Sequence, residues 1–386
     1  MNASHARRIA SASVLLILFE CSTDAGNVSG VEGGSPESGG GSNDATTDAG
    51  TSNDATLSDA TTDTNPTEGG GVDARDVVVD SSRDAGICPF SSSDYLPPSG
   101  KASSGGGPNV SRLLGATSND GLNFTKTLKI ISDQADVPSL VQDGKGCLYL
   151  YYVGWTVGTK QNVTALALSG DNGTTWVYKY VNFSGFPFSP VPQVDPTIQI
   201  FPNGDFYLYV TYPNNAGHKA THYATSTDGI NFSYGGIAFS HSTDVSDPTT
   251  VLIGNTWYYW AGGPPAAGAN NWFATSTDGR TFNAATYPSN NPSGTFSMTF
   301  SGDRQLVSNG TSLGSGARVY TYNMMLNNKT TINSASTTDG ATWTADPGSR
   351  LTLDSTNGLE SVQIKEPAPV KLANGMYFLV YSTKIP

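Results

Sequence analysis

Acidic residues that directly precede proline recur at wide intervals in this chain of 386 residues. Among them are the segments Asp195-Pro196-Thr197, Asp247-Pro248-Thr249 and Glu366-Pro367-Ala368. Two further acids, Asp136 and Asp303, occupy similar positions without the full pattern. Carboxyl groups gathered in one site can do acid–base chemistry, because crowded like charges raise some pKa values and leave other groups ionised. Cleavage of a glycosidic bond needs one protonated carboxylic acid and one carboxylate, about 5–9 Å apart.

An acid before proline also has a purely structural interpretation. Its carboxylate can accept hydrogen bonds from backbone N–H groups where a strand begins, without any contact to a ligand. The interpretation depends on whether the fold brings these acids to one place.

Five short turns, each centred on an aspartate and closed by an aromatic residue, recur every 50 to 61 residues. They lie at 118–124, 169–176, 226–232, 276–282 and 337–343. In such turns Asp and Asn bond their own backbone, and Gly takes the position with positive φ. A strand-rich unit repeated about every 50 residues is typical of a propeller array.

Each repeat also contains two strand-like segments joined by a turn with glycine, and the second segment is rich in aromatic residues. The first Asp turn precedes every such pair, and the last pair, 366–382, has no Asp turn after it. Pairs and turns therefore match only if residues 110–126 complete the last sheet. The sequence predicts an all-β fold, a five-bladed β-propeller of four-stranded antiparallel blades, with the ring closed by N-terminal strands that join the last blade.

Strands alternate in direction within a blade, so the Asp turns and the acid-opened strands fall on opposite faces of the ring. We call the face that carries the acids the top face. The Asp turns are then structural. The acids Asp136, Asp195, Asp247, Asp303 and Glu366 would surround one narrow mouth at the axis.

Other candidate ligand contacts fall in the expected top-face loops. Aromatic residues there could stack on sugar rings or simply pack: Trp155, Phe186, Phe188, Tyr212 and Trp260. His218 and His241 would bond substrate hydroxyls or lie on the surface. Four histidines without ligand spacing predict no zinc site. The acids offer oxygen ligands for a Ca²⁺ ion in the channel, but no loop motif specifies one, and we expect no other cofactor.

The repeats resemble those of known propeller enzymes. The turn at 169–176 resembles the full Asp-box, and the other four resemble its shorter form in five-bladed glycosidases. Within 110–386, residues 247–259 resemble the Asp-Pro strand pairs of glycoside hydrolase family 43, and 366–382 resembles the segment that carries the general acid.

This resemblance implies three catalytic roles. Carried over in chain order, they are a base (Asp247), an acid that tunes the general acid's pKa (Asp303) and the general acid (Glu366). The chain departs from the family pattern because Asp303 lacks the proline, Asp195 has it in another blade, and the glutamate is in the last blade. The catalytic set would therefore be permuted or eroded.

The acidity of the chain is concentrated in a tail. The formal net charge is −12, and residues 22–86 carry 13 acidic and two basic residues, whereas 87–386 is nearly neutral. This distribution provides no basic patch for nucleic acid. The stretch 22–86 has too few apolar residues to form a core and predicts a disordered linker.

The first 21 residues resemble a bacterial lipoprotein leader that ends at Cys21, although Glu20 departs from that signal. The alternative is an ordinary cleaved signal. We expect a protein of the cell envelope or the extracellular space, anchored to a membrane only through Cys21, and a monomer. Cys88 and Cys147 either form a disulfide or are free thiols, since spacing alone does not decide the geometry.

Three functions remain open from the sequence. The first, which the residues favour, is a membrane-tethered glycoside hydrolase acting on extracellular poly- or oligosaccharides. The second is a non-catalytic carbohydrate-binding propeller. The third is a sialidase, suggested by the full Asp-box at 169–176. It is disfavoured because sialidases have six blades and an arginine triad, whereas 87–386 has few arginines: Arg112, Arg280, Arg304, Arg318 and Arg350.

Overall fold

The structure is a computed structural model that describes most of the predicted propeller. The described residues are 88, 90, 92–155, 163–188, 190–262, 271–284, 305–323, 330–340 and 342–386. The expected leader (1–21) with Cys21, the expected linker (22–86) and Asp303 lie outside them. No helix among the described residues is long and apolar enough to cross a membrane.

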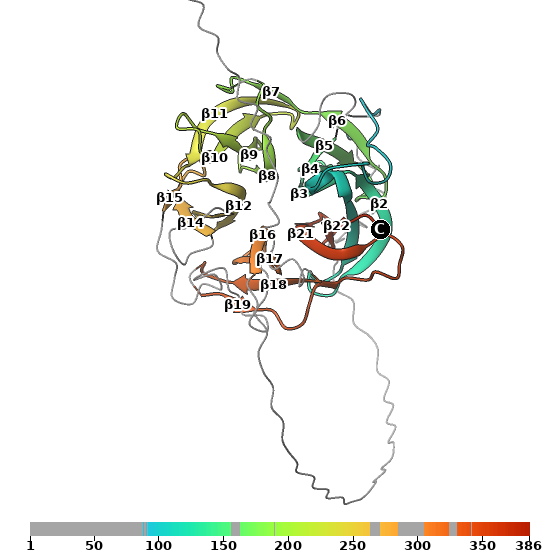
Figure 1. Cartoon of the computed structure of the whole chain (residues 1–386). Helices are drawn as coiled ribbons and strands as arrows, with labels where there is room; N and C mark the ends of the chain where they lie inside the picture. The colour runs from blue at the N-terminus through green and yellow to red at the C-terminus, as the bar shows by residue number, and fades with distance from the viewer. Residues whose placement is uncertain are drawn as a thin grey trace, which may run out of the picture. The chain divides into compact units, whose positions relative to one another are not determined.

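Five small antiparallel sheets surround a common axis, which confirms the predicted five-bladed propeller (Figure 1). The strands of the first blade are β3 (Ala135–Gln142), β4 (Leu148–Gly154), β5 (Val163–Ser169) and β6 (Val177–Tyr180). Those of the second are β8 (Val194–Ile200), β9 (Phe206–Pro213), β10 (Lys219–Ser226) and β11 (Asn231–Phe239). Those of the third are β12 (Ser246–Ile253), β13 (Thr256–Gly262), β14 (Asn271–Ser276) and β15 (Asn283–Ala284). Those of the fourth are β16 (Gln305–Ser312), β17 (Ala317–Asn323), β18 (Thr331–Thr337) and β19 (Thr344–Ala345).

The fifth blade joins the two ends of the propeller. Its strand order is β2-β1-β22-β21, from β1 (Ser111–Ser118), β2 (Thr125–Asp133), β21 (Ser361–Lys371) and β22 (Tyr377–Lys384). The short 3-10 helix η1 (Gly107–Val110) precedes β1. The predicted closure by N-terminal strands is thus confirmed, and β1 pairs with β22 along its whole length. This pairing leaves no open end in the ring.

Two blades carry a strand beyond the predicted four. In the second blade, β7 (Asn182–Ser184) pairs in parallel with β11, and in the fourth, β20 (Leu351–Thr352) pairs with β18. Both are short segments of the connections between blades, and each protects part of an outer edge.

Alternation along each strand divides its side chains between two cores, because a blade packs against a neighbour on both faces. On β4, Leu148, Leu150 and Tyr152 pack towards the fifth blade, whereas Tyr149 and Tyr151 pack towards the second. This explains why the second strands are aromatic and apolar throughout.

The Asp turns have the structural role predicted for them. In the turn of the second blade, Ser226 Oγ donates to Asp228 Oδ1 (2.8 Å), and that oxygen accepts the backbone N–H groups of Ile230 and Asn231 (both 2.8 Å). Burial raises the pKa of Asp228, but these bonds outweigh it and lower the pKa to about 2. The carboxylate is occupied by its own turn.

Three of these turns also hold the preceding blade. Tyr209 Oη donates to the carbonyl oxygen of Gly279 (2.5 Å), and Tyr320 Oη donates to that of Gly121 (2.8 Å). Tyr151 Oη bonds Gly229 O in the same way. A tyrosine on the second strand of one blade thus reaches the Asp turn of the next, which links neighbouring blades on the bottom face.

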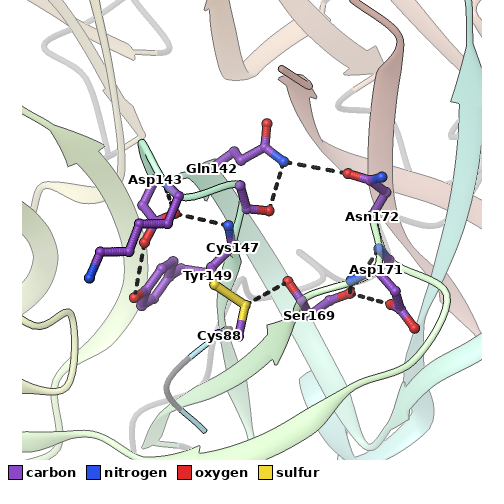
Figure 2. Close-up of a disulfide and its surroundings, with 11 residues drawn as sticks. Cys88, Gln142, Asp143, Cys147, Tyr149, Ser169, Asp171 and Asn172 are labelled. Carbon is purple, nitrogen blue, oxygen red and sulfur yellow. Dashed lines mark hydrogen bonds between the residues drawn. A yellow bond between two sulfur atoms is a disulfide. The ribbon is translucent and has the colours of Figure 1, made fainter. Parts of the chain in front are cut away.

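Cys88 and Cys147 form a disulfide, with 5.6 Å between their Cα atoms (Figure 2). Cys147 follows the turn between β3 and β4, and its N–H donates to Asp143 Oδ1 (2.9 Å). The bond ties the segment that leads to the closing strands to the first blade, on the face that carries the Asp turns. Of the two possibilities left open by the sequence, a disulfide or free thiols, the structure shows the disulfide.

Candidate active site

The innermost strand of each blade contains a β-bulge near its start. In four blades the residue before proline lies in the left-handed region, with φ between 50° and 52°: Val137, Asp195, Asp247 and Glu366. The register with the second strand shifts at the same place in each of them. Non-glycine residues in this region cost of the order of 1–3 kcal/mol each and gather at functional sites. A shared backbone device therefore presents one side chain per blade near the axis.

The fourth blade has a valine at the corresponding position. Asn309 pairs with Tyr320, as Thr197 pairs with Tyr209 in the second blade, and the register shift in β16 lies between Val307 and Asn309. Val307 therefore corresponds in register to Asp195 and its counterparts. The residue at this position of the bulge is acidic in the second, third and fifth blades and apolar in the first and fourth.

A pocket of about 500 Å³, including space open to solvent, lies among these positions. It receives residues from every blade, among them Val137, Pro196, Asp247, Val307 and Glu366. The structure thus brings two of the predicted catalytic carboxyl groups, those of Asp247 and Glu366, into one pocket.

Glu366 is 5% exposed and is held from two sides. Its Oε1 accepts from Lys365 Nζ (2.6 Å), and its Oε2 accepts from the backbone N–H of Val137 (2.8 Å). Burial and then the charge of Asp136 raise the pKa of Glu366 to about 8, although the ammonium of Lys365 opposes this rise. Glu366 therefore keeps its proton at neutral pH.

Asp247 is partly exposed and has a different environment. Its backbone N–H donates to Thr211 Oγ1 (3.2 Å), and its Oδ2 faces Gly262 on β13. Burial and then the charge of Asp195 raise its pKa to about 7, against the attraction of Lys365 and Lys219. The pKa values of both pocket carboxyls are therefore raised, but by different neighbours: Asp195 acts on Asp247, and Asp136 acts on Glu366.

Hydrogen bonds join the innermost strands of different blades at the residues that directly follow the bulges. Asn309 Nδ2 donates to the carbonyl oxygens of Pro138 (3.2 Å) and Pro367 (3.0 Å), and Asn309 Oδ1 accepts from Ser139 Oγ (3.1 Å). One amide of the fourth blade therefore bonds both the first and the fifth blade.

The remaining blades join the same belt of hydrogen bonds. Ser139 Oγ accepts from the backbone N–H of Ile198 on β8 (3.1 Å), and Thr197 Oγ1 donates to the carbonyl oxygen of Pro248 on β12. Thr197 and Ser139 are 3% and 1% exposed. Thr197 and Asn309 of this belt also line the pocket, where they form a polar floor.

Three other acids were expected at the mouth. Asp195 is 4% exposed and acts electrostatically on Asp247, but it does not line the pocket described above. Asp136 is 2% exposed and lies behind Glu366, where Lys365 and Ser382 bond it. Asp303 lies outside the described residues.

The expected substrate-contact residues are dispersed. Trp260 lines the pocket, and its Nε1 is buried without a hydrogen-bond partner among the described residues. Trp155 Nε1 bonds Asn109 Oδ1 near η1. Tyr212 packs against two aromatic rings of the connection between the first two blades, Phe186 and Phe188.

Each of the two predicted histidines contacts another side chain away from the pocket. His218 Nδ1 is 3.7 Å from Asp244 Oδ1, and the exposed ring of His241 packs on Trp272 with 4.1 Å between ring centroids. Neither histidine is among the residues that line the pocket. Among the predicted contacts, the structure therefore brings only Trp260 to the two acids.

The pocket lining contains acids without arginine among the described residues. No arginine among the described residues lines the pocket; Arg112 and Arg318 pair with Asp133 and Asp346 instead. No group of three His, Cys, Asp or Glu side chains in the described ranges could hold a metal ion.

Sequence reasoning missed Lys365, Asn309 and Tyr322. Lys365 directly precedes the catalytic candidate Glu366, and a lysine inside an otherwise apolar strand is a signal that could have indicated an internal partner. Tyr322 on β17 lines the pocket. Asn309 precedes a glycine, as the turn asparagines do, and so resembles a turn residue in the sequence, but it lies within β16.

No protein-family model and no curated protein matches this sequence. Solved structures similar to it include an N-acetylgalactosamine deacetylase from F. plautii, 12% identical, covering 67% of this chain and 81% of that chain, with a TM-score of 0.47. A thermostable family-43 glycoside hydrolase is 13% identical over 64% of this chain and 88% of its own, with a TM-score of 0.47. A GH43 protein from Bacillus licheniformis is 14% identical over 69% and 50%, with a TM-score of 0.45. Several of these proteins are glycoside hydrolases, but likeness this distant says nothing about the activity of this chain.

Proposed function

We propose that this protein is a glycoside hydrolase in which Glu366 is the general acid and Asp247 the general base. One observation carries the proposal: two carboxyl groups line a single pocket but differ in environment. Glu366 is buried and bonded to Lys365 and to the N–H of Val137, whereas Asp247 is partly exposed, and burial raises the pKa of both carboxyl groups. Glycosidases use such a difference between two carboxyl groups.

The chemistry follows from these environments. Glu366 would donate its proton to the oxygen of the leaving sugar, and the resulting carboxylate would be stabilised by Lys365 and by the N–H of Val137. Asp247 would take a proton from the attacking water. The buried ring of Trp260 would form an apolar wall of the pocket.

The charges of the pocket support a neutral sugar as the substrate. Its lining includes two acids and no arginine or lysine among the described residues. An anionic sugar such as a uronate or a sialoside would meet repulsion there without a paired cation. This favours neutral poly- or oligosaccharides over a sialidase substrate.

The direct experiment is hydrolysis of an aryl-glycoside panel by the full chain: arabinofuranoside, xyloside, galactoside, fructoside and sialoside. Turnover of a neutral glycoside that is lost in Glu366→Gln and in Asp247→Asn would support the proposal. Glu360→Gln, a buried glutamate bonded to Lys126 and Tyr381 outside the pocket, and Asp244→Asn on the top rim are matched controls. Full turnover in Glu366→Gln of an unactivated glycoside of the same sugar, whose leaving group needs a proton, would refute the assignment of the acid.

One observation favours the second function, a carbohydrate-binding propeller without catalysis. Both carboxyl oxygens of Glu366 are already bonded within the protein, as in a purely structural role. Calorimetric titration with the same sugars separates the two functions. Binding without turnover, equal in wild type and Glu366→Gln, would establish the binding protein and exclude the enzyme.

We further propose that the protein is exported and lipidated on Cys21. The leader sequence and the disulfide support this, because disulfides persist in oxidising compartments. Metabolic labelling with palmitate should mark the wild type and leave Cys21→Ser unmarked. Labelling of neither protein would indicate a cleaved signal without an anchor.

A further inference from the structure

Behind the pocket, three charged side chains form a compact buried cluster. Lys365 Nζ is 2.9 Å from Asp136 Oδ2 and 2.6 Å from Glu366 Oε1. The side chains of Lys365, Asp136 and Glu366 are 5%, 2% and 7% exposed. One ammonium group therefore bridges two carboxyl groups in a largely buried place.

The backbone explains how neighbouring residues reach the same cluster. In a regular strand, consecutive side chains point to opposite faces. The bulge between Lys365 and Ala368, with the positive φ of Glu366, interrupts this alternation. Lys365 and Glu366 can therefore both face Asp136 on β3.

The charge count fixes what the cluster does. Two carboxylates and one ammonium leave a net charge of −1, and burying an uncompensated charge is costly. A single proton retained by the cluster removes this cost. Ser382 Oγ donates to Asp136 Oδ1, and a hydrogen bond joins the two carboxyl groups. The extra bond from Ser382 favours charge on Asp136 and the proton on Glu366.

We propose that Lys365 and Asp136 are positioning residues that, with Glu366, form one proton-sharing unit: Lys365 fixes the carboxyl group of Glu366, and Asp136 keeps the proton on it. This inference rests on the proposed function for its purpose, but not for its test. When Glu366 gives up its proton, the ammonium already 2.6 Å away stabilises the new carboxylate.

Other titratable groups face this unit from the remaining inner strands. Tyr322 on β17 interacts electrostatically with Glu366, and Asp247 on β12 interacts with Lys365. On β22, Lys384 adds attraction for the charge of Asp136. These groups act on the unit in every variant below, so a change in its titration reports on the residue replaced.

Two substitutions should move the titration of Glu366 in opposite directions. Lys365→Met removes the cation and should raise its pKa, whereas Asp136→Asn removes the neighbouring negative charge and should lower it. A charge within about 4–6 Å shifts a carboxyl pKa by about one to three units. Lys371→Met, at the exposed end of the same strand, is the matched control and should leave the titration unchanged.

The measurement is a ¹³C NMR titration of the full chain labelled at the carboxyl carbon of its six glutamates, with the Glu366 signal assigned by its loss in Glu366→Gln. Shifts of opposite sign would establish the proton-sharing unit. Shifts of the same sign, or none, would overturn it. The titration needs no substrate, so it stands even where the glycoside panel shows no turnover. If Lys365→Met does not fold, Asp136→Asn decides alone. A lower pKa of Glu366 in that variant would support the proposal, and an unchanged pKa would refute it.

Discussion

Reduction of the disulfide should destabilise the propeller by an amount set by the loop that it closes. The two cysteines are 59 residues apart, and the segment between them contains β1, β2 and β3. For a loop of this length, the entropy removed from the unfolded chain corresponds to about 4 kcal/mol at 25 °C. Because β1 and β2 complete the fifth blade, the bond restrains the strands that close the ring.

The test compares oxidised and reduced protein rather than a mutant, so the packing around the buried Cys147 is retained. Guanidinium unfolding, followed by tryptophan fluorescence, gives the free energy of unfolding of each form. The experiment is done in a Cys21→Ser background, because Cys21 is the chain's one other cysteine. A double Cys88→Ala, Cys147→Ala variant should resemble the reduced form, with a small added packing loss.

The expected result is a free energy of unfolding lower by roughly 3–5 kcal/mol after reduction. A difference below about 1 kcal/mol would refute the reasoning, since it would mean that the unfolded chain gains no freedom when the loop opens. Unfolding that loses its single transition only in the reduced form would show that the closing strands separate before the rest of the ring.

Three further predictions follow from single positions. Gly229→Ala should lower the free energy of unfolding by about 2 kcal/mol or more, because Gly229 has φ +73° and a Cβ would lie 2.7 Å from the Tyr149 ring. The control Gly144→Ala, with open space around it, should be nearly neutral. Asn309→Ala leaves buried carbonyl oxygens of two blades unpaired and should cost about 2–4 kcal/mol in denaturant unfolding; a neutral result would contradict the floor described for the pocket. The pKa of Glu366 rises from 4.5 to about 8 on folding, so the wild type should lose stability as the pH rises between these values. Glu366→Gln should lose less stability over the same range. Parallel pH profiles of the two melting temperatures would count against the raised pKa.

The fold was predictable because its signals are local. Aspartate turns, glycine turns and alternating aromatic strands each repeat in sequence, and the missing turn after Tyr381 indicated closure by the N-terminal strands. The short strand β7 escaped prediction, since Asn182–Ser184 pairs in parallel with a strand of the next blade and carries no pattern of its own. The disulfide was undecidable, because it depends on a distance between Cys88 and Cys147 that spacing does not give.

The site was only partly predictable, because its geometry depends on where each bulge falls. Counting acids near strand starts grouped Asp136 with Asp195 and Asp247. The register instead places Val137 at the equivalent position and Asp136 one residue earlier, behind Glu366. A shift of one residue in a strand changes the face of a side chain. Partnerships such as that of Lys365 with Asp136 lie 229 residues apart, beyond any local pattern.

The central claim is that Glu366 is a general acid, and leaving-group dependence tests it most directly. The measurement compares kcat for two glycosides of the sugar that the panel identifies, one with a dinitrophenyl leaving group and one with an unactivated alcohol. A dinitrophenolate needs no proton to depart, so Glu366→Gln should leave its release almost unchanged while the unactivated glycoside slows by about 10²–10⁴-fold. An equal loss on both substrates, or no loss on either, would contradict the account and remove Glu366 from the role of acid.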